Sequence, residues 1–167
     1  DLDITLTSPA GTIVTITSDN GGVNDNVFNG TVWDDDADPG NTLPFAAATN
    51  AAFNWVVDRT YTNLVTATTL VPEEAMGAFL GENPNGTWTL TVSDDLSSNG
   101  GNLSSWSLQI GSVAAATYDA VASFSNTTPL DLTPADGAGA PVSSTIVVSG
   151  AGTNLTDLNM STFITHT

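Results

Sequence analysis

Carboxylates make up nearly all of the side chains that could do chemistry in this chain. Of its 167 residues, 18 are Asp or Glu, whereas Arg59 is the one basic residue and His166 the one histidine. Cysteine is absent, so the sequence offers neither thiol chemistry nor a disulfide framework.

A hydrolase needs a nucleophile, a base and a group that orients the base. The one histidine, His166, falls on the same alternating face as Leu158, Met160 and Ile164, which favours a structural position. The sequence holds no Gly-x-Ser-x-Gly elbow, no Walker loop and no zinc-ligand spacing. We therefore expect that the chain is not an enzyme.

Paired carboxylates are a second candidate, because a glycosidase uses two of them. Asp94-Asp95 and Glu73-Glu74 are such pairs. Nothing in the sequence ties either pair into a cleft, so solvated acids are the simpler interpretation.

The net charge of −17 restricts the partners. Such a surface repels phosphate backbones and anionic lipid, so we expect no nucleic-acid partner and no membrane insertion. Cations are the natural partners. No apolar run is long enough to span a bilayer, and the chain has the character of a mature or excised segment.

The clearest structural pattern lies between Phe79 and Ile110. Trp88, Leu90 and Val92 alternate with threonines, and Trp106, Leu108 and Ile110 alternate with polar residues. This period of two predicts two strands that each bury one face, with both tryptophans in one core. Turn signals separate them, at Asn85-Gly86 and at 99–101.

Most of the remaining chain also has strand character. Residues 1–18 predict a β-hairpin, and 19–38 a long loop with short strand pieces. The run 43–55 is ambiguous, and a short helix is conceivable at 72–76. Strands return at 145–148 and 158–164. This order predicts an all-β, jelly-roll-like sandwich with little or no helix.

These motifs resemble the P domain (P/Homo B domain) of subtilisin-like proprotein convertases and secreted bacterial proteins. The matching residues are Gly81-Glu82, Asn85-Gly86-Thr87-Trp88-Thr89-Leu90, Val92, Asp94, Gly101, Leu103 and Trp106-Ser107-Leu108. Asp1-Leu2-Asp3-Ile4, Leu6, Ser8-Pro9 and Gly11-Thr12 are similar to the early strand pair of that family. The resemblance implies a secreted or cell-surface, non-catalytic module.

Calcium is the metal that this chemistry favours, because carboxylate, amide and carbonyl oxygens are the hard ligands it prefers. Asp1, Asp3 and Asp94 match family positions near bound calcium. Loop acids that could join them are Asp19, Asp25, Asp34, Asp35 and Asp36. The alternative is an acidic surface that serves solubility.

The order of the blocks differs from the family. Val147, Gly150, Asp157-Leu158-Asn159 and 164–167 resemble the stretch that precedes Asp1-Leu2-Asp3-Ile4 there, yet here they come last. Either the domain is circularly permuted, or the chain is one period of a tandem array; we favour the array. We therefore divide the chain into the main sandwich (1–111), a connecting segment with short strands (112–143) and opening strands of a next copy, or donated strands (144–167). Those opening strands should pair outside their own uninterrupted domain.

Three functions remain open at this stage. The first is an extracellular structural repeat of a surface fibre, filament or long adhesin, whose partners are other copies of itself. The second is an auxiliary P domain of a secreted subtilisin-like protease. The third is a carbohydrate-binding module, which inward-facing tryptophans disfavour. Six Asn-x-Ser/Thr sequons begin at Asn29, Asn85, Asn102, Asn126, Asn154 and Asn159.

Overall fold

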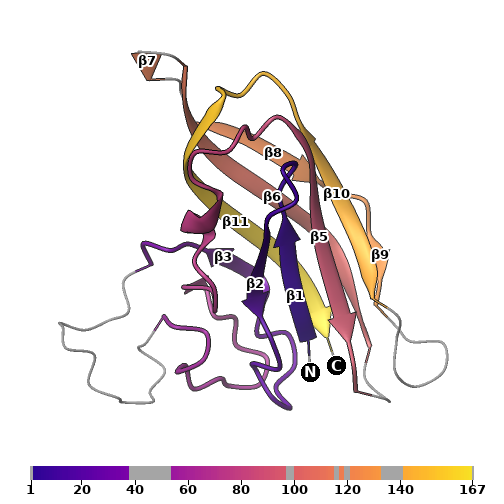
Figure 1. The fold of residues 1–167 in the computed structure, drawn as a ribbon. Helices are drawn as coiled ribbons and strands as arrows, with labels where there is room; N and C mark the ends of the chain where they lie inside the picture. The colour runs from indigo at the N-terminus through magenta and orange to yellow at the C-terminus, as the bar shows by residue number, and fades with distance from the viewer. Residues whose placement is uncertain are drawn as a thin grey trace, which may run out of the picture.

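The computed structural model describes residues 2–37, 54–96, 100–114, 117–118, 121–132 and 141–166. Two β-sheets face each other across one hydrophobic core (Figure 1). The predicted class, an all-β sandwich, is therefore confirmed. The ambiguous run 43–55 lies mostly outside the described residues.

The first sheet has four antiparallel strands in the order β10-β5-β1-β2. They are β1 (Leu2–Thr7), β2 (Ile13–Thr17), β5 (Gly86–Asp94) and β10 (Val142–Val148). In β1 and β5 every second side chain is buried, as expected for strands with one face on the core. The β1–β2 hairpin confirms the interpretation of residues 1–18.

The second sheet has seven strands, with the central order β4-β3-β11-β6-β7 and with β8 and β9 also on β6. Its longer strands are β3 (Asn29–Trp33), β6 (Gly101–Ala114), β8 (Ala122–Asn126) and β11 (Asn154–His166). The short ones are β4 (Thr69–Leu70), β7 (Thr117–Tyr118) and β9 (Leu130–Asp131). The strands β7, β8 and β9 all pair with β6, so this part of the predicted connecting segment extends the second sheet.

Tryptophans anchor the core from both sheets. Trp88 of β5 and Trp106 of β6 are 0% and 1% exposed, so the predicted shared core is confirmed, although the two strands belong to opposite sheets. Each indole N–H has an acceptor: Trp88 donates to the Pro84 carbonyl at 2.9 Å and Trp106 to the Ser144 hydroxyl at 3.0 Å. These two hydrogen bonds offset the cost of removing water from the buried indole N–H groups.

The prediction of a short helix at 72–76 is wrong. The structure places a 3-10 helix, η1, at Met76–Phe79. The Glu73 and Glu74 N–H groups instead donate to the Ile16 and Thr15 carbonyls of β2, both at 3.0 Å. Main-chain pairing with a sheet edge satisfies these groups better than a short isolated helical turn would.

Strands β10 and β11 pair within their own chain, so the expectation that 144–167 complete a separate domain is wrong for this structure. β10 pairs with β5, and β11 lies between β3 and β6, in register from Asn154↔Val113 to His166↔Gly101. The cause is the alternation of buried Leu158, Met160 and Ile164, which completes the same core. An origin of 144–167 in a following repeat stays a prediction, as do the boundaries at 111 and 143.

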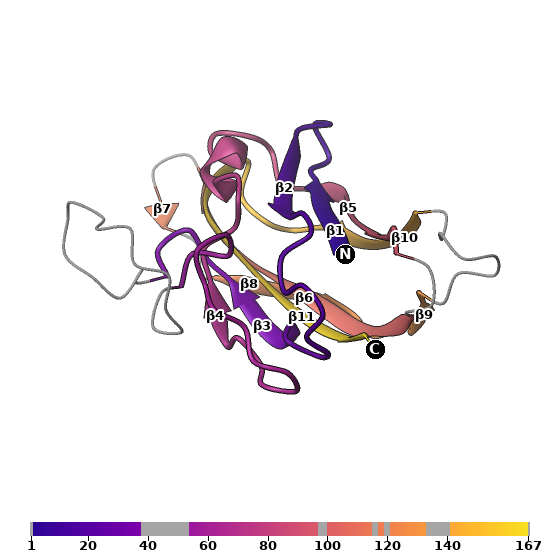
Figure 2. The ribbon, with the colours of Figure 1, turned by 90° about the horizontal axis from the view of Figure 1, so that it is seen from below.

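Both chain ends lie at one end of the sandwich (Figures 1 and 2). β1 starts there in the first sheet and β11 finishes there in the second, and Leu2 and Ile164 line one small pocket. The register also puts Val142 of β10 and Asp131 of β9 at this end, opposite Val92 and Asn102.

Candidate functional site

Acidic side chains gather in two groups, of which the first surrounds Asp3 on β1. Burial raises the pKa of the Asp3 carboxyl, and the nearby charges of Asp19 and Asp95 raise it further. The buried Asp3 Oδ1 has no hydrogen-bond partner among the described residues. Folding therefore brings three carboxylates together at an energetic cost that a cation would reduce.

The second group joins Asp157 of β11 to the loop after β3. Burial is the largest cause that raises the pKa of the Asp157 carboxyl. The charges of Asp34 and Asp36 and, more weakly, Asp35 raise it further. The Asn159 amide lies between the acids: one orientation donates to Asp157 Oδ2 at 3.3 Å, the other to Asp34 Oδ1 at 3.0 Å. A cavity of about 120 Å³ opens beside this group, lined by Asp35, Asp36, Met76, Gly77, Leu80, Thr156, Asp157 and Leu158.

Hydrogen bonds already use some of these carboxylates. Asp35 accepts the Met76 and Gly77 N–H groups at 2.8 and 2.6 Å, so it caps the start of η1. Asp34 accepts the Asp36 N–H at 2.8 Å, which fixes the turn between them. Lone pairs committed to N–H donors are less available to a metal.

Of the other predicted ligands, Asp94 and Asp25 are not among the acids whose charges raise the pKa of Asp3 or Asp157. Asp94 is 4% exposed and its Oδ1 accepts the Leu96 N–H at 3.2 Å. Asp25 donates its backbone N–H to Asn63 Oδ1 at 2.6 Å. Asp1 is outside the described residues.

No group of three or more His, Cys, Asp or Glu side chains among the described residues is arranged to hold a metal ion. The donor set there does not form a ready chelate. The assignment of individual calcium ligands to Asp1, Asp3, Asp19, Asp25, Asp34, Asp35, Asp36 and Asp94 therefore stays a prediction.

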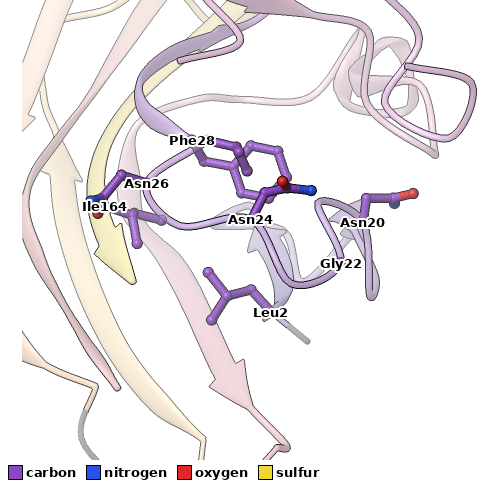
Figure 3. Close-up of a pocket in the computed structure, with 8 residues that line it drawn as sticks. Leu2, Asn20, Gly22, Asn24, Asn26, Phe28 and Ile164 are labelled. Atoms are coloured by element: carbon purple, nitrogen blue, oxygen red, sulfur yellow. The ribbon is translucent and has the colours of Figure 1, made fainter. Parts of the chain in front are cut away.

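A pocket at the end of the sandwich that carries the chain termini gathers amide side chains (Figure 3). Asn20, Asn24 and Asn26 come from the loop after β2, and Leu2 and Ile164 form its apolar floor. Its volume is about 10 Å³, which suits one water molecule and no larger ligand.

A stretch that runs from the loop before β4 into β6 shows the relationship to known proteins. Residues 54–110 match the family model of the proprotein convertase P-domain. The resemblance seen in the sequence is thereby confirmed for these residues. Neither a curated protein nor a solved structure matches the chain significantly.

Within the P-domain stretch, the glutamate pair has a structural use. The Glu74 carboxylate accepts the Thr15 N–H at 2.6 Å, and that of Glu73 accepts the Ser18 N–H at 2.6 Å and its hydroxyl. These bonds, with the main-chain bonds of the same residues, cover the outer edge of β2. Both carboxylates are therefore engaged as hydrogen-bond acceptors at a sheet edge, which favours a structural use of this pair over the glycosidase hypothesis.

Sequence reasoning missed the roles of Asp95, Asp157 and Glu82. Asp95 and Asp157 contribute to the two acidic groups only because distant strands meet. The Thr12 hydroxyl donates to Glu82 Oε1 across the hairpin turn of the first sheet, whereas the Glu82 Oε2 and Ser8 Oγ atoms are buried without a partner among the described residues. Gly81-Glu82 stood out in the sequence, but local pattern alone did not reveal its partner.

Among the described residues, no helix is long and apolar enough to cross a membrane.

Proposed function

We propose that this chain is a non-catalytic structural module of an extracellular protein, repeated along a surface fibre, a filament or a long adhesin. The observation that carries the proposal is the P-domain match at residues 54–110, because P domains are auxiliary rather than catalytic and are typical of secreted proteins. The structural use of Glu73 and Glu74 supports the same view.

Strand donation is not part of the proposal, because β10 and β11 pair within their own chain. The position of the chain ends supports a different arrangement. Since both ends lie at one end of the sandwich, copies joined through them would stand side by side rather than extend head to tail (Figure 1).

The second candidate is an auxiliary P domain of a secreted subtilisin-like protease, which the description of the matching family favours. A carbohydrate-binding module is less well supported. Trp33, Trp88 and Trp106 are fully buried, so none of these three offers an aromatic platform for a sugar ring.

Calcium is proposed as the counter-ion of the acidic groups around Asp3 and Asp157. The raised pKa values of both carboxyls and the unpartnered Asp3 Oδ1 support a cation there. Because the described residues form no closed ligand set, this calcium would complete its shell with water and main-chain carbonyls.

An antibody raised against the purified module tests the role in its native setting. If the chain is a structural repeat, the antibody should label intact cells and detect a large polypeptide. Peptides from this sequence should then be more abundant in that polypeptide than peptides from its single-copy regions. Co-purification with a serine protease in the culture medium, at one copy per polypeptide, would instead favour the auxiliary domain.

Absence of catalysis is tested directly on the pure protein. We expect no turnover of casein, ester or aryl-glycoside substrates, because the Glu73 and Glu74 carboxylates serve as hydrogen-bond acceptors at the edge of β2. Turnover that persists through purification and is lost in His166→Ala or Glu74→Gln would overturn the proposal.

A further inference from the structure

The outer face of the seven-stranded sheet carries rows of short polar side chains. Figure 2 shows β6 and β11 side by side in the layer that lies opposite β1 and β5. Two rows of hydroxyl and amide groups cross β11, β6 and β8: Ser161, Ser107 and Ser125 in one, and Asn159, Gln109 and Ser123 in the next. Their neighbours Met160 and Leu108 are buried, so both rows face away from the core.

A half-exposed aromatic ring stands beside these rows. Phe163 follows Ser161 on the same face of β11 and is 48% exposed. In β3, Gly30 has φ of +97°, and a Cβ at this position would lie 3.4 Å from the Phe163 ring. The ring therefore packs against the neighbouring strand and leaves its other side to solvent.

A second aromatic side chain extends the same face beyond β4. Trp55 bridges to Val71, directly after β4, and is 37% exposed. The adjacent Val56 is buried, so the indole lies on the outer side of the sheet. Unlike Trp33, Trp88 and Trp106, this tryptophan reaches the surface.

The face is almost neutral, although the molecule has a net charge of −17. In the sequences of β3, β6, β8 and β11, Asp157 is the one acidic residue, and it lies near the start of β11. Nucleic acids and anionic glycans are repelled by the whole molecule, and a cationic partner would be drawn to the acidic groups instead. A protein partner would need a contiguous apolar centre, which isolated rings between hydroxyl rows do not provide.

We propose that this face binds an extended, neutral, β-linked polysaccharide. A sugar unit has an apolar C–H side that packs on an aromatic ring, and hydroxyl groups that bond to Ser, Asn and Gln side chains. Neighbouring strands lie about 4.8 Å apart, so the polar groups of each row recur at a spacing close to the length of one sugar unit in such a chain. The polysaccharide would therefore run across the strands, with Phe163 as its anchor. This binding goes beyond the proposed structural role and does not depend on it.

Electrophoresis of the native protein in gels that contain a soluble polysaccharide tests the binding. We expect the neutral, extended probes hydroxyethylcellulose, glucomannan and arabinoxylan to retard the protein, and anionic alginate not to. Phe163→Ala should weaken binding roughly tenfold or more, because it removes the aromatic anchor. Phe163→Tyr keeps the ring and should retain most of the affinity.

A substitution in the middle of a row gives the matched comparison. Ser107→Glu removes a hydroxyl and places a long charged side chain across the row, so it should abolish the retardation. Thr89→Glu adds the same charge to the outer face of the other sheet and should leave binding unchanged. Thermal unfolding of each variant verifies the fold, and Phe163→Tyr and Ser107→Glu carry the test if Phe163→Ala does not fold.

Three results would overturn the inference: no retardation by any of the three neutral probes, retardation by alginate of equal strength, or equal losses in Ser107→Glu and Thr89→Glu. Each result comes from the purified protein, so it is separable from failure of the proposed function.

Discussion

Asp3 and Asp157 illustrate at the residue scale what the high acidity costs this protein. Both carboxyls have a raised pKa, caused first by burial and then by neighbouring carboxylates. A carboxyl whose pKa is higher in the folded state favours folding only while it is protonated. Its contribution is present below the unfolded pKa and is lost as the pH rises through the folded pKa.

In calcium-free buffer, Asp157→Asn is therefore expected to stabilise the fold at neutral pH. The amide keeps the shape but removes the charge that faces Asp34 and Asp36, and we expect the melting temperature at pH 7 to rise by about 1–3 °C. The gain should shrink as the pH falls and vanish near pH 3, where the native carboxyl is protonated in both states. The measurement is thermal unfolding at the two pH values, with Asp58→Asn, at an exposed position, as the control. A gain in melting temperature that is the same at low pH would contradict charge repulsion as the cause.

Residue-scale prediction from sequence worked where the signal was local. The inward positions of Trp88 and Trp106 followed from alternation, and both are buried. The partners of Asp3 and Asp157 did not follow, because loops more than ninety positions away in sequence supply part of each group. Only the meeting of β11 with the loop after β3 brings Asp157 beside Asp34.

At the scale of elements, the entry into β5 depends on a close approach between two turns. Gly86 has φ of +139°, and a Cβ at this position would lie 2.8 Å from the Pro9 Cβ. The Asn85 amide, beside it, bonds to both Ala151 and the turn residue Asn83. The turn signal Asn85-Gly86 thus marks a contact with the turn of the β1–β2 hairpin as well as a change of direction.

Gly86→Ala should destabilise the protein by roughly 2–4 kcal/mol, because backbone strain and the Pro9 clash add. The control is Gly81→Ala, at φ of +87° with open space around the new Cβ, where strain alone should cost about 1–2 kcal/mol. Urea unfolding of both variants gives the difference. Equal losses would show that the Pro9 contact is not limiting.

The misplaced helix shows why some elements escape a sequence-based prediction. Pro72-Glu73-Glu74 has the composition of a helix start, and local propensity supports it. The competing partner is the free edge of β2, which is adjacent only after the sheets form. Strands with strong alternation were predictable for the opposite reason, since their pattern already states which face is buried.

The whole molecule must offset its net charge of −17 to remain folded. Chelator is expected to lower the melting temperature at moderate salt, because crowded carboxylates then repel one another without a counter-ion. A ligand that binds only the folded state adds about 2.7 kcal/mol at a hundredfold excess over its Kd. Magnesium is the comparison ion. If the chelator leaves the melting temperature unchanged, the protein has no stabilising calcium site.

The self-contained sandwich corrects one part of the interpretation drawn from block order, the expectation that 144–167 pair outside their own domain. Their origin in a following copy stays a prediction. The block order, compared with that of the family, suggested that 144–167 belong to a following copy. The alternation of a strand shows which face is buried but does not show which sheet the strand joins. In the structure β11 is a central strand of its own chain, between β3 and β6. The proposed assembly would therefore use finished surfaces rather than missing strands.

Hydrogen exchange of the β11 amides, measured on the dilute monomer, decides whether one chain completes its own sandwich. Central strands exchange only through global opening, so we expect Leu158, Met160 and Ile164 to be among the slowest amides, with protection independent of protein concentration. Fast exchange at low concentration, with protection that appears only as copies associate, would mean that β11 docks into another copy and would contradict the self-contained fold.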